Sequence, residues 1–477
     1  MKKKIIDKYR CAPLPLKATV WFTICQFAQS GMGFLITPFL VRMLPMEEYG
    51  RTGVFMSWVT LFFPIATLSS SNAIMNLCVR YDKRQSMLSA VLGYNLLLAV
   101  IWGILLLLTG DFVIRATGLS KPLIIYLYLL GISNSQIFCW TLVRQYEYAY
   151  KIVVLEALLY TVAASLGSLF AVAFIAPTAE NKIFPQVLFS VIIGLIITIF
   201  VFKSGEKFYN KDIWRYTFGF CVPLLPHYLS EIVLMSSDRI MIDRMCGSSD
   251  VAIYSVAYTV GSIIVIVTRA IDSAFTPYQY QKIKDKAFKT LAGNTNFIIA
   301  FVALCLYGIM LFAREIVLVF GGYKYMDSIT LIIPICLGVF FNYIFRLFAR
   351  VQEYYEQKHT IVFASVSCAV LNILLNYVFI RIYGYRAAAY TTFVCYFAFC
   401  FMHYMFYRKA CRKYVGQKIY DIKGIVLISM VLILLSALIP LINSIYFMKY
   451  VLLATVIGIT LWQRVRIVEF VKIIRTR

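Results

Sequence analysis

Long apolar runs of about 20 residues, separated by short polar turns, repeat along nearly the whole chain. A run of this length crosses a bilayer as an α-helix. Fourteen such runs lie between about residue 18 and residue 464 of the 477 residues. The intervals between them are too short for a soluble domain. The pattern therefore predicts an all-α membrane protein of about 14 transmembrane helices.

Two turns with similar residues indicate a repeat within these helices. Arg42–Gly50 follows the first run and Arg244–Ala252 follows the seventh, at a constant offset of 202 residues. Glu147–Tyr148 before the fifth run and Glu353–Tyr354 before the eleventh correspond at an offset of 206. The repeat predicts two six-helix lobes in parallel orientation, followed by two C-terminal helices. Parallel repeats of this kind place a substrate cavity at the interface of the halves.

Basic residues are distributed unevenly between the two sides of the predicted membrane. Of the 46 Lys and Arg, 33 fall in the tails and even-numbered loops and 12 in the odd-numbered loops. Cytoplasmic loops carry the excess of Lys and Arg, so both termini are predicted to lie in the cytoplasm. The predicted segments are a basic cytoplasmic N-terminal segment (1–17), an N-lobe of spans 1–6 (18–202), a cytoplasmic inter-lobe loop (203–215), a C-lobe of spans 7–12 (216–407), a basic cytoplasmic loop (408–423), spans 13–14 (424–463) and a basic cytoplasmic tail (464–477).

Composition excludes several other classes. Charged residues make up only 14% of the chain, against about 25% in soluble proteins. The net charge of +24 is explained by basic loops that orient the protein near anionic lipid. Attraction of an anionic substrate is the alternative explanation, and no nucleic-acid partner is expected.

The basic N-terminus has no apolar run directly after its lysines, so no cleaved signal peptide is expected. Twelve cysteines without a CxxC pair or a Cys/His cluster predict neither a metal site nor a disulfide framework, and no cofactor is expected.

Polar residues inside the seventh run form one stripe. At 100° per residue, Pro223, His227, Glu231 and Asp238 fall within about 80° of arc. A charge at membrane depth costs roughly 3 kcal/mol or more, so such residues face a bundle interior or a watery cavity. His227, Glu231 and Asp238 are therefore candidates for coupling transport to H⁺ or Na⁺. An interhelical hydrogen-bonded pair without transport is the alternative, and Pro223 with Pro226 predicts a bend in this span.

The eighth run carries a second polar stripe, which includes Tyr258, Arg269 and Asp272. We expect Arg269 to be a cavity cation that is held in part by Asp272, three residues further on. A guanidinium donates two parallel hydrogen bonds and therefore suits phosphate oxygens. The alternative is an anchor at the lipid interface, because Arg269 lies about two turns from the predicted cytoplasmic end of its span.

Other basic residues end spans on the predicted cytoplasmic side. Asn342, Arg346 and Arg350 repeat at i, i+4 and i+8 at the end of span 10, while Arg144 ends span 4 and Arg80 ends span 2. These residues are candidates for the rim of an entrance that accepts an anionic headgroup. Simple positive-inside anchoring is the alternative for each of them.

Three stretches of the chain have a recognisable pattern. They are Pro38–Pro45 with Glu48–Gly50, Asp238–Ile242 with Gly247 and Ala252–Tyr258, and Asn372–Asn376 with Gly384–Ala388. These stretches resemble those of a known family, the bacterial polysaccharide repeat-unit flippases of the O-antigen transporter type, in the multidrug/oligosaccharidyl-lipid/polysaccharide exporter superfamily. The likeness covers essentially the full chain, with one departure at Ala252, where the family pattern has glycine.

The resemblance implies a 14-helix flippase whose lobes surround a central basic cavity. Its substrate would be a sugar repeat unit on undecaprenyl pyrophosphate, moved to the outer leaflet of the bacterial inner membrane by alternating access. Arg269, Arg346 and Arg350 are then expected to meet the pyrophosphate, and Glu231 or Asp272 to couple to an ion gradient. The implied partners are the lipid-linked oligosaccharide, membrane lipid, a polysaccharide polymerase and glycosyltransferases, and a functional monomer is expected.

Three alternatives remain at this point. A cation-coupled multidrug exporter of the same superfamily usually has twelve spans and an acidic interior, which disfavours it. A peptidoglycan-precursor flippase has the same architecture and stays open. A membrane polymerase or ligase needs a catalytic loop or cluster, but the longest predicted external connection, Ala313–Met326, has no histidine and no nucleophile–base pair. The sequence therefore predicts a transporter and not an enzyme.

Overall fold

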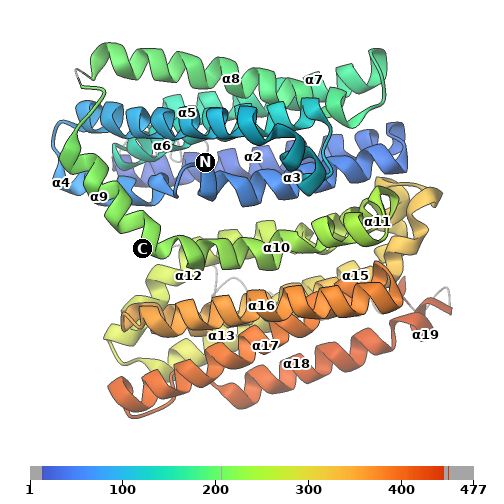
Figure 1. Ribbon diagram of the computed structural model, residues 1–477. Helices are drawn as coiled ribbons and strands as arrows, with labels where there is room; N and C mark the ends of the chain where they lie inside the picture. Colours follow the sequence, from blue (N-terminus) through green and yellow to red (C-terminus); the bar gives the residue numbers. More distant parts are fainter. Residues whose placement is uncertain (1–12, 206, 445–448, 451–477) are drawn as a thin grey trace, which may run out of the picture. The chain divides into compact units, whose positions relative to one another are not determined.

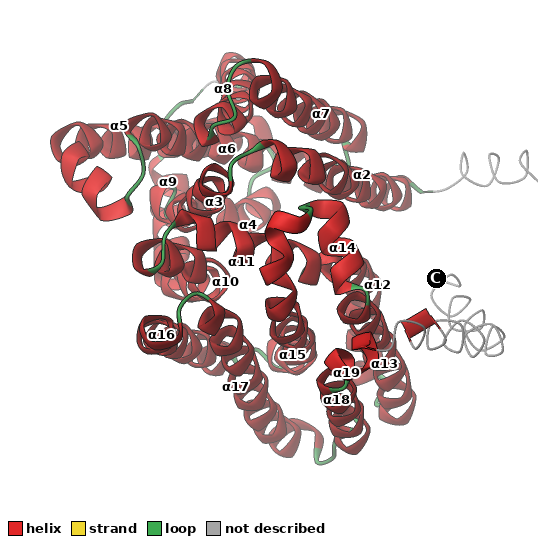
Figure 2. Cartoon of the chain, turned by 90° about the vertical axis from the view of Figure 1, so that its right-hand side faces the viewer, coloured by secondary structure: helices red, strands yellow, loops and turns green. Residues whose placement is uncertain are grey.

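The computed structural model describes residues 13–205, 207–444, 449 and 450. Within these residues every regular element is a helix and no strand is present (Figures 1 and 2). Nine of the described helices are long and apolar enough to cross a membrane, and twelve spans result if each of three bent pairs counts as one. The predicted all-α membrane class is confirmed.

The helices follow one another with short connections. The first half of the chain forms α2 (Leu14–Met43), α3 (Met46–Ala66), η1 (Ser70–Ala73), α4 (Ile74–Arg80), α5 (Arg84–Thr117), α6 (Lys121–Tyr146), α7 (Tyr150–Phe174), α8 (Ala179–Ser204), α9 (Lys211–Cys221), η2 (Val222–Leu224) and α10 (Leu225–Met245). The second half forms α11 (Ser248–Gly261), α12 (Ile263–Lys284), α13 (Phe288–Leu311), α14 (Ala313–Phe320), η3 (Tyr323–Ser328), α15 (Ile329–Tyr354), α16 (Lys358–Tyr383), α17 (Arg386–Ala410), η4 (Cys411–Val415), α18 (Ile422–Ala437) and α19 (Ile439–Ser444).

Some predicted segments lie largely outside the described residues. These are most of the N-terminal segment 1–17, nearly all of span 14 and the whole tail 464–477. Predicted span 13 corresponds to α18, which has 16 residues, followed by the short helix α19.

The chain divides into two compact units. Unit 1 comprises 1–255 with 373–388, and unit 2 comprises 256–372 with 389–477. The boundaries of these units differ from those of the predicted lobes, because α10 and the first part of α11 pack with the helices of the first half. The lobe boundaries derived from the repeat stay a prediction.

Unit 1 is a bundle in which α7 lies between α2 and α8, and α8 also packs on α6 (Figure 1). Its core includes Leu77, Leu88 and Val143, which are fully buried. Large apolar side chains also remain on its surface, such as Leu107, which is 88% exposed, and Phe174, which is 76% exposed. A soluble protein rarely exposes so much apolar surface, whereas a bilayer covers it.

Unit 2 is organised around α15, which contacts α12 and α13, while α13 also packs on α18 (Figure 2). Most of α15 is buried, including Phe340, Tyr343 and Phe348. Phe348 packs against the rings of Tyr407 and Tyr420, at 5.0 and 6.0 Å between centroids. Burial raises the pKa of Tyr420 well above its ordinary value, so its hydroxyl stays protonated and donates to the Leu347 carbonyl oxygen at 3.1 Å.

Some helix ends in the two halves of the chain are separated by the same offset as the two similar turns. Met43 and Met245 end α2 and α10, and Met46 and Ser248 begin the helices that follow, so both boundaries keep the offset of the two turns. Further along, α6 ends at Tyr146 and α15 at Tyr354. This offset is larger by two positions than the offset between the Glu147–Tyr148 and Glu353–Tyr354 pairs. These two pairs are therefore slightly out of register with the helix ends.

Breaks interrupt three of the spans. Met46–Ala66 and Ser70–Arg80 meet at 55°, Lys211–Leu224 and Tyr228–Met245 at 55°, and Ser248–Gly261 and Ile263–Asp272 at 41°. Pro226 lies in the second break and Pro223 lies in η2 just before it, so the bend that the sequence predicts is present. Broken helices at membrane depth are tolerated where the freed backbone groups line a cavity or are buried in protein.

Candidate functional site

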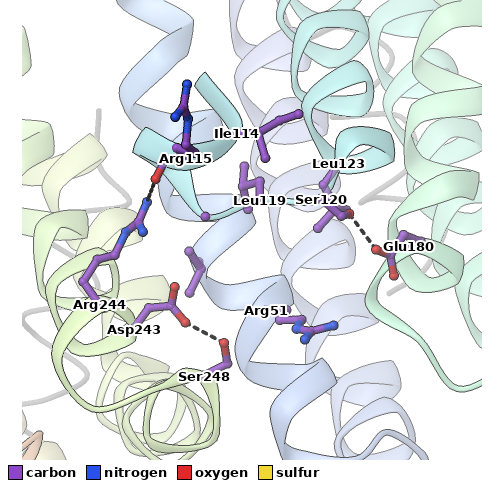
Figure 3. Close-up of a pocket in the computed structure, with 12 residues that line it drawn as sticks. Arg51, Ile114, Arg115, Leu119, Ser120, Leu123, Glu180, Asp243, Arg244 and Ser248 are labelled. Atoms are coloured by element: carbon purple, nitrogen blue, oxygen red, sulfur yellow. Dashed lines mark hydrogen bonds between the residues drawn. The ribbon is translucent and has the colours of Figure 1, made fainter. Parts of the chain in front are cut away.

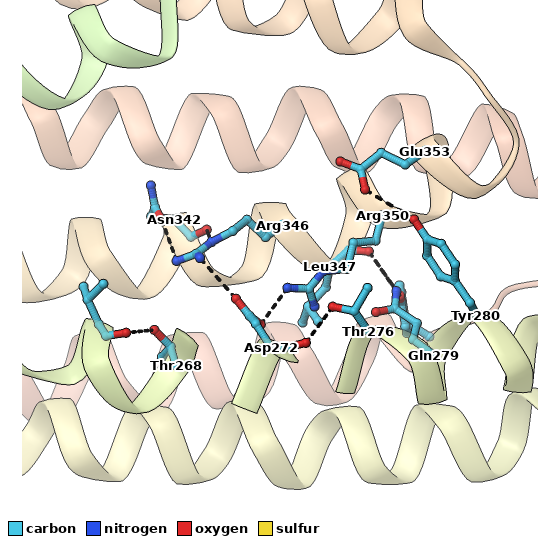
Figure 4. A network of polar contacts seen from close by, with 12 residues as sticks. Thr268, Asp272, Thr276, Gln279, Tyr280, Asn342, Arg346, Leu347, Arg350 and Glu353 are labelled. Carbon is cyan, nitrogen blue, oxygen red and sulfur yellow. Dashed lines mark hydrogen bonds and ion pairs between the residues drawn. The ribbon is translucent and has the colours of Figure 1, made fainter. Parts of the chain in front are cut away.

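A charged cluster joins α12 and α15 inside unit 2 (Figure 4). Thr268, Asp272, Thr276 and Gln279 are spaced four, four and three residues apart, so they share one face of α12. On α15 the residues that face them have the same spacing. They are Asn342, Arg346, Arg350 and Glu353.

Asp272 is the centre of this cluster. Arg346 Nη1 lies 3.1 Å from its Oδ2, and Arg350 Nη2 lies 2.6 Å from its Oδ1. Arg346 also donates to the side-chain oxygen of Asn342 at 3.1 Å. Next to the cluster, Gln279 donates to the Leu347 carbonyl oxygen at 3.4 Å, which further ties α12 to α15.

Around Asp272 the positive charges outnumber the carboxylates. Two guanidinium groups face Asp272, whereas Glu353 at the end of the cluster accepts from the Tyr280 hydroxyl at 3.4 Å. The Arg350 side chain is only 9% exposed. Among the described residues, Arg350 Nη1 and the Tyr343 hydroxyl are both buried without a hydrogen-bond partner. A buried donor left unsatisfied costs about 1–3 kcal/mol. Since Arg346 is 29% exposed, the arrangement suits an anion that approaches Arg346 and completes the contacts of the pair.

Arg269 lies outside this cluster. It is on α12 and exposed, and it makes no ion pair with any residue in the described part of the chain. The predicted contact between Arg269 and Asp272 is therefore wrong. The reason is tertiary, because two arginines from α15 occupy both oxygens of the carboxylate.

A second aspartate, which is fully buried, lies in unit 1. Asp238 on α10 is 1% exposed. Tyr254 from α11 donates its hydroxyl to Oδ2 at 2.5 Å, and Asn376 from α16 donates its amide to Oδ1 at 2.6 Å. Three helices thus position one carboxylate with two neutral donors. The proximity of Asn376 connects a residue of the family-like stretch Asn372–Asn376 to the seventh-span stripe, which sequence reasoning had not joined.

The other residues of the predicted sites are dispersed. Glu231 on α10 is exposed, and the side chain of His227 lies outside the described residues. Tyr258 on α11 is half-buried. Arg144 pairs with Glu147 at 2.6 Å.

At the end of α4, Arg80 lies 4.1 Å above the Tyr216 ring. Arg80 and Arg144 both belong to unit 1. They are thus held by neighbours in that unit, and whether they rim an entrance stays a prediction.

Sequence reasoning missed two ionisable residues inside the spans of unit 1. Glu156 on α7 lies near the side chains of Cys25 and Tyr160. Lys182 on α8 donates from Nζ to the Thr52 hydroxyl at 2.8 Å. For Glu156 the available signal was a charge inside an apolar run. Lys182 precedes the apolar run that begins near residue 184, so no such signal pointed to it.

Sequence reasoning also missed a cavity of about 530 Å³ in unit 1. It lies where α3 breaks, and α6 and α10 complete its wall. The polar run Ser69–Asn72 inside an otherwise apolar span was the signal that could have located it. The lining residues are Val59, Thr60, Phe63, Pro64, Ser69, Ser71, Asn72, Asn134, Ile137, Phe138, Thr141, Tyr228 and Ile232.

A polar cavity of about 500 Å³ occupies the end of unit 1 near the α10–α11 turn (Figure 3). Arg244 donates to the main-chain oxygen of Arg115 at 3.0 Å, and also to that of Ala116. These are among the last carbonyls of α5, where the helix dipole favours a cation. On the same turn, Ser248 donates to Asp243 at 2.5 Å.

The two repeat-related turns meet at this end of unit 1. A Cβ atom on Gly50 would overlap the Ser248 carbonyl oxygen, and one on Gly53 would lie 2.8 Å from Ser255 Oγ. Only glycine permits this approach of α3 to α11. Extensive packing of α3 against α10 continues the contact, so α3 and the α10–α11 turn are closed against each other at this end of unit 1, beside the polar cavity.

The helical spans define a multi-span membrane protein, and Asp238, Asp272 and the arginine pair place charged groups inside those spans. A family model described as "Polysaccharide biosynthesis protein" matches residues 16–281, and one described as MatE matches 223–378. Because the first match covers more than half of the chain, the protein belongs to the polysaccharide biosynthesis protein family.

Relatives and solved structures agree with this assignment. Lsg locus putative protein 1 of Haemophilus influenzae is 24% identical over 355 residues, which are 69% of this chain and 84% of that protein. The inward closed structure of the lipid II flippase MurJ has a TM-score of 0.66 at 14% identity and covers 91% of this chain and 100% of its own. An inward-facing multidrug MATE transporter of the MOP superfamily has a TM-score of 0.59 at 15% identity and covers 83% and 99%. The resemblance predicted from the sequence is confirmed, and the chain is a flippase or transporter of that superfamily.

Proposed function

We propose that the protein moves an oligosaccharide repeat unit, linked to undecaprenyl pyrophosphate, across the cytoplasmic membrane by alternating access. The arginine pair on α15 is the observation that supports this most. Arg346 and Arg350 are one helical turn apart, and together they carry one more positive charge than Asp272 neutralises. A pyrophosphate offers adjacent charged oxygens that accept hydrogen bonds from both guanidinium groups. A cationic drug would meet a like charge there, which disfavours multidrug export.

Ion coupling is a second part of the proposal. Asp238 is almost completely buried, and its two donors, Tyr254 and Asn376, are neutral. A buried aspartate at membrane depth is typical of residues that bind H⁺ or a cation during transport. We therefore assign ion coupling to Asp238, with Glu231 on the same helix as the alternative coupling residue.

The closed end of unit 1 acts as a gate in this proposal. The positive-inside distribution assigns the α2–α3 and α10–α11 turns to the outer side of the membrane. Gly50 against Ser248 and Arg244 against the end of α5 would then seal the outer side while the substrate enters from the cytoplasm. Glycosyltransferases would supply the substrate and a polymerase would consume it, and this chain itself would form no covalent bond.

The test is deletion of the gene from its host, followed by analysis of lipid-linked intermediates. The proposal expects loss of surface polysaccharide and accumulation of the undecaprenyl-linked repeat unit, and re-expression should restore both. Loss of peptidoglycan synthesis would instead favour a flippase for the peptidoglycan precursor, a function named for the structurally similar MurJ. Unchanged polysaccharide with increased drug sensitivity would reject the proposal in favour of multidrug export.

A further inference from the structure

The cavity at the break in α3 lies at membrane depth and is lined mainly by neutral groups. Asn134 is the fourteenth residue of α6 (Lys121–Tyr146), about 20 Å from its start at 1.5 Å per residue. The lining includes the hydrogen-bonding side chains of Thr60, Ser69, Asn72 and Thr141. Among the residues that the structure describes, it has no acidic, basic or histidine residue.

Several of these polar groups have unused hydrogen-bonding capacity. The Ser69 hydroxyl is buried without a partner among the described residues. Within the same part of the chain, Asn72 and Thr141 make no side-chain hydrogen bond. Asn134 accepts one from Ser190 at 2.8 Å and donates none from its amide. Unpaired polar groups at membrane depth are costly, so a hydrogen-bonding ligand would stabilise this lining.

Backbone strain is concentrated at the same place. Leu68 and Ser69 have φ angles of 47° and 55°, which are unusual for residues other than glycine. The Ser69 amide donates to the Pro64 carbonyl oxygen at 2.9 Å, so the chain turns back on itself before η1. Strained backbone of this kind is typical of ligand-binding sites and switch regions. The strained turn separates α3 from η1 at the wall of the cavity.

The lining also distinguishes between classes of ligand. An organic cation would lack a carboxylate partner in this cavity, and a lipid chain would leave the hydroxyl and amide groups unpaired. Sugars present many hydroxyls together with apolar C–H faces. The aromatic rings of Phe63, Phe138 and Tyr228 offer surfaces for those faces, and the Ser, Thr and Asn side chains match the hydroxyls.

We propose that this cavity binds the sugar portion of the substrate, separately from the arginine pair that takes the pyrophosphate. The inference rests on the proposed function and adds a location for the oligosaccharide. Substitutions in the cavity should change affinity for the sugar without changing affinity for the lipid pyrophosphate.

The experiment compares binding of two probes to the full-length protein in lipid nanodiscs. The probes are undecaprenyl pyrophosphate and the same lipid carrying a hexose–N-acetylhexosamine disaccharide. Asn134→Ala and Thr141→Val should each weaken binding of the disaccharide lipid about 5- to 10-fold, the value of one lost hydrogen bond. Their affinity for undecaprenyl pyrophosphate should change less than about twofold. Thr198→Val is the matched control, because among the described residues the Thr198 hydroxyl bonds only to the Gly194 carbonyl oxygen within α8.

Three results would overturn the inference. The first is a wild-type protein that binds both lipids equally, and the second is a cavity variant that binds both lipids like the wild type. The third is an equal loss of affinity for both lipids. If the wild type binds neither lipid, the proposed function fails as well, so the two failures are distinguishable. Retained binding of undecaprenyl pyrophosphate also shows that a variant is folded.

Discussion

Two aspartates inside helical spans, one in each unit, have different surroundings. Asp238 in unit 1 accepts hydrogen bonds from Tyr254 and Asn376, both neutral. Asp272 in unit 2 faces Arg346 and Arg350. Neutral donors from two helices position the first carboxylate, whereas two cationic groups from one helix hold the second. We therefore assign coupling to Asp238, and Asp272 holds the arginine pair in place.

The largest effect is expected on breaking the ion pairs of Asp272. Asp272→Asn leaves two guanidinium groups largely buried without a counter-charge, and removing one partner of a buried pair costs about 3–5 kcal/mol. We expect a large drop in the thermal midpoint of the full-length protein in detergent. The double variant Asp272→Asn/Arg350→Met should recover part of this loss. An unchanged midpoint in the single variant would contradict the charged cluster.

Asp238→Asn should have the contrasting effect. Asn can accept from Asn376, and the Tyr254 hydroxyl can turn to accept from the new amide, so stability should change by only about 1 kcal/mol. Transport in vesicles should lose its dependence on a pH or Na⁺ gradient, because the position can no longer ionise. Glu231→Gln is the comparison variant. Retained gradient dependence in Asp238→Asn, with its loss in Glu231→Gln, would move the coupling site to Glu231.

The closed end of unit 1 can be tested through a native cysteine. Burial raises the pKa of the Cys246 thiol, and only the thiolate reacts readily, so labelling should be slow in the wild type. Gly50→Ala forces a Cβ atom against the Ser248 carbonyl oxygen. This overpacking destabilises the contact of α3 with the α10–α11 turn by about 1 kcal/mol or more. Labelling of Cys246 should therefore become about fivefold faster. Gly33→Ala is the control, because its Cβ would meet no atom within 4 Å. Equal labelling in all three proteins would reject the gate.

The smallest effect is expected at Arg269. Its side chain is exposed and lies outside the cluster of α12 and α15, so Arg269→Ala should lower the transport rate less than about threefold, in the range of a surface charge. The rate is measured at equal protein content in vesicles. A loss as large as that of an Arg350 variant would place Arg269 at the substrate and restore the interpretation drawn from the sequence.

Local signals predicted the fold well. Helix length follows from the apolar runs, and the Arg42 and Arg244 turns located corresponding helix ends in the two halves because turn chemistry depends on neighbouring residues. Pro223 and Pro226 predicted a bend for the same reason.

Contacts between residues far apart in the sequence were not predictable in this way. Asp272, Arg346 and Arg350 were each identified as candidates, but their pairing required the packing of α12 on α15. The contact of Asp238 with Asn376, between α10 and α16, is a second case. The cavity at Ser69–Asn72 was different, because its local signal existed in the sequence as polar residues inside an apolar span.

The most direct test of the account measures movement of an undecaprenyl-pyrophosphate-linked oligosaccharide across the bilayer of vesicles containing the purified protein. The wild type should move this lipid. Arg350→Gln removes a charged donor worth about 1.5–3 kcal/mol, so this variant should move the lipid at less than about a tenth of the wild-type rate. Arg381→Gln is the control, since Arg381 is an exposed arginine that bonds to Tyr377. Its rate should match that of the wild type. Equal rates for Arg350→Gln and the wild type would contradict the claim that the arginine pair carries the pyrophosphate.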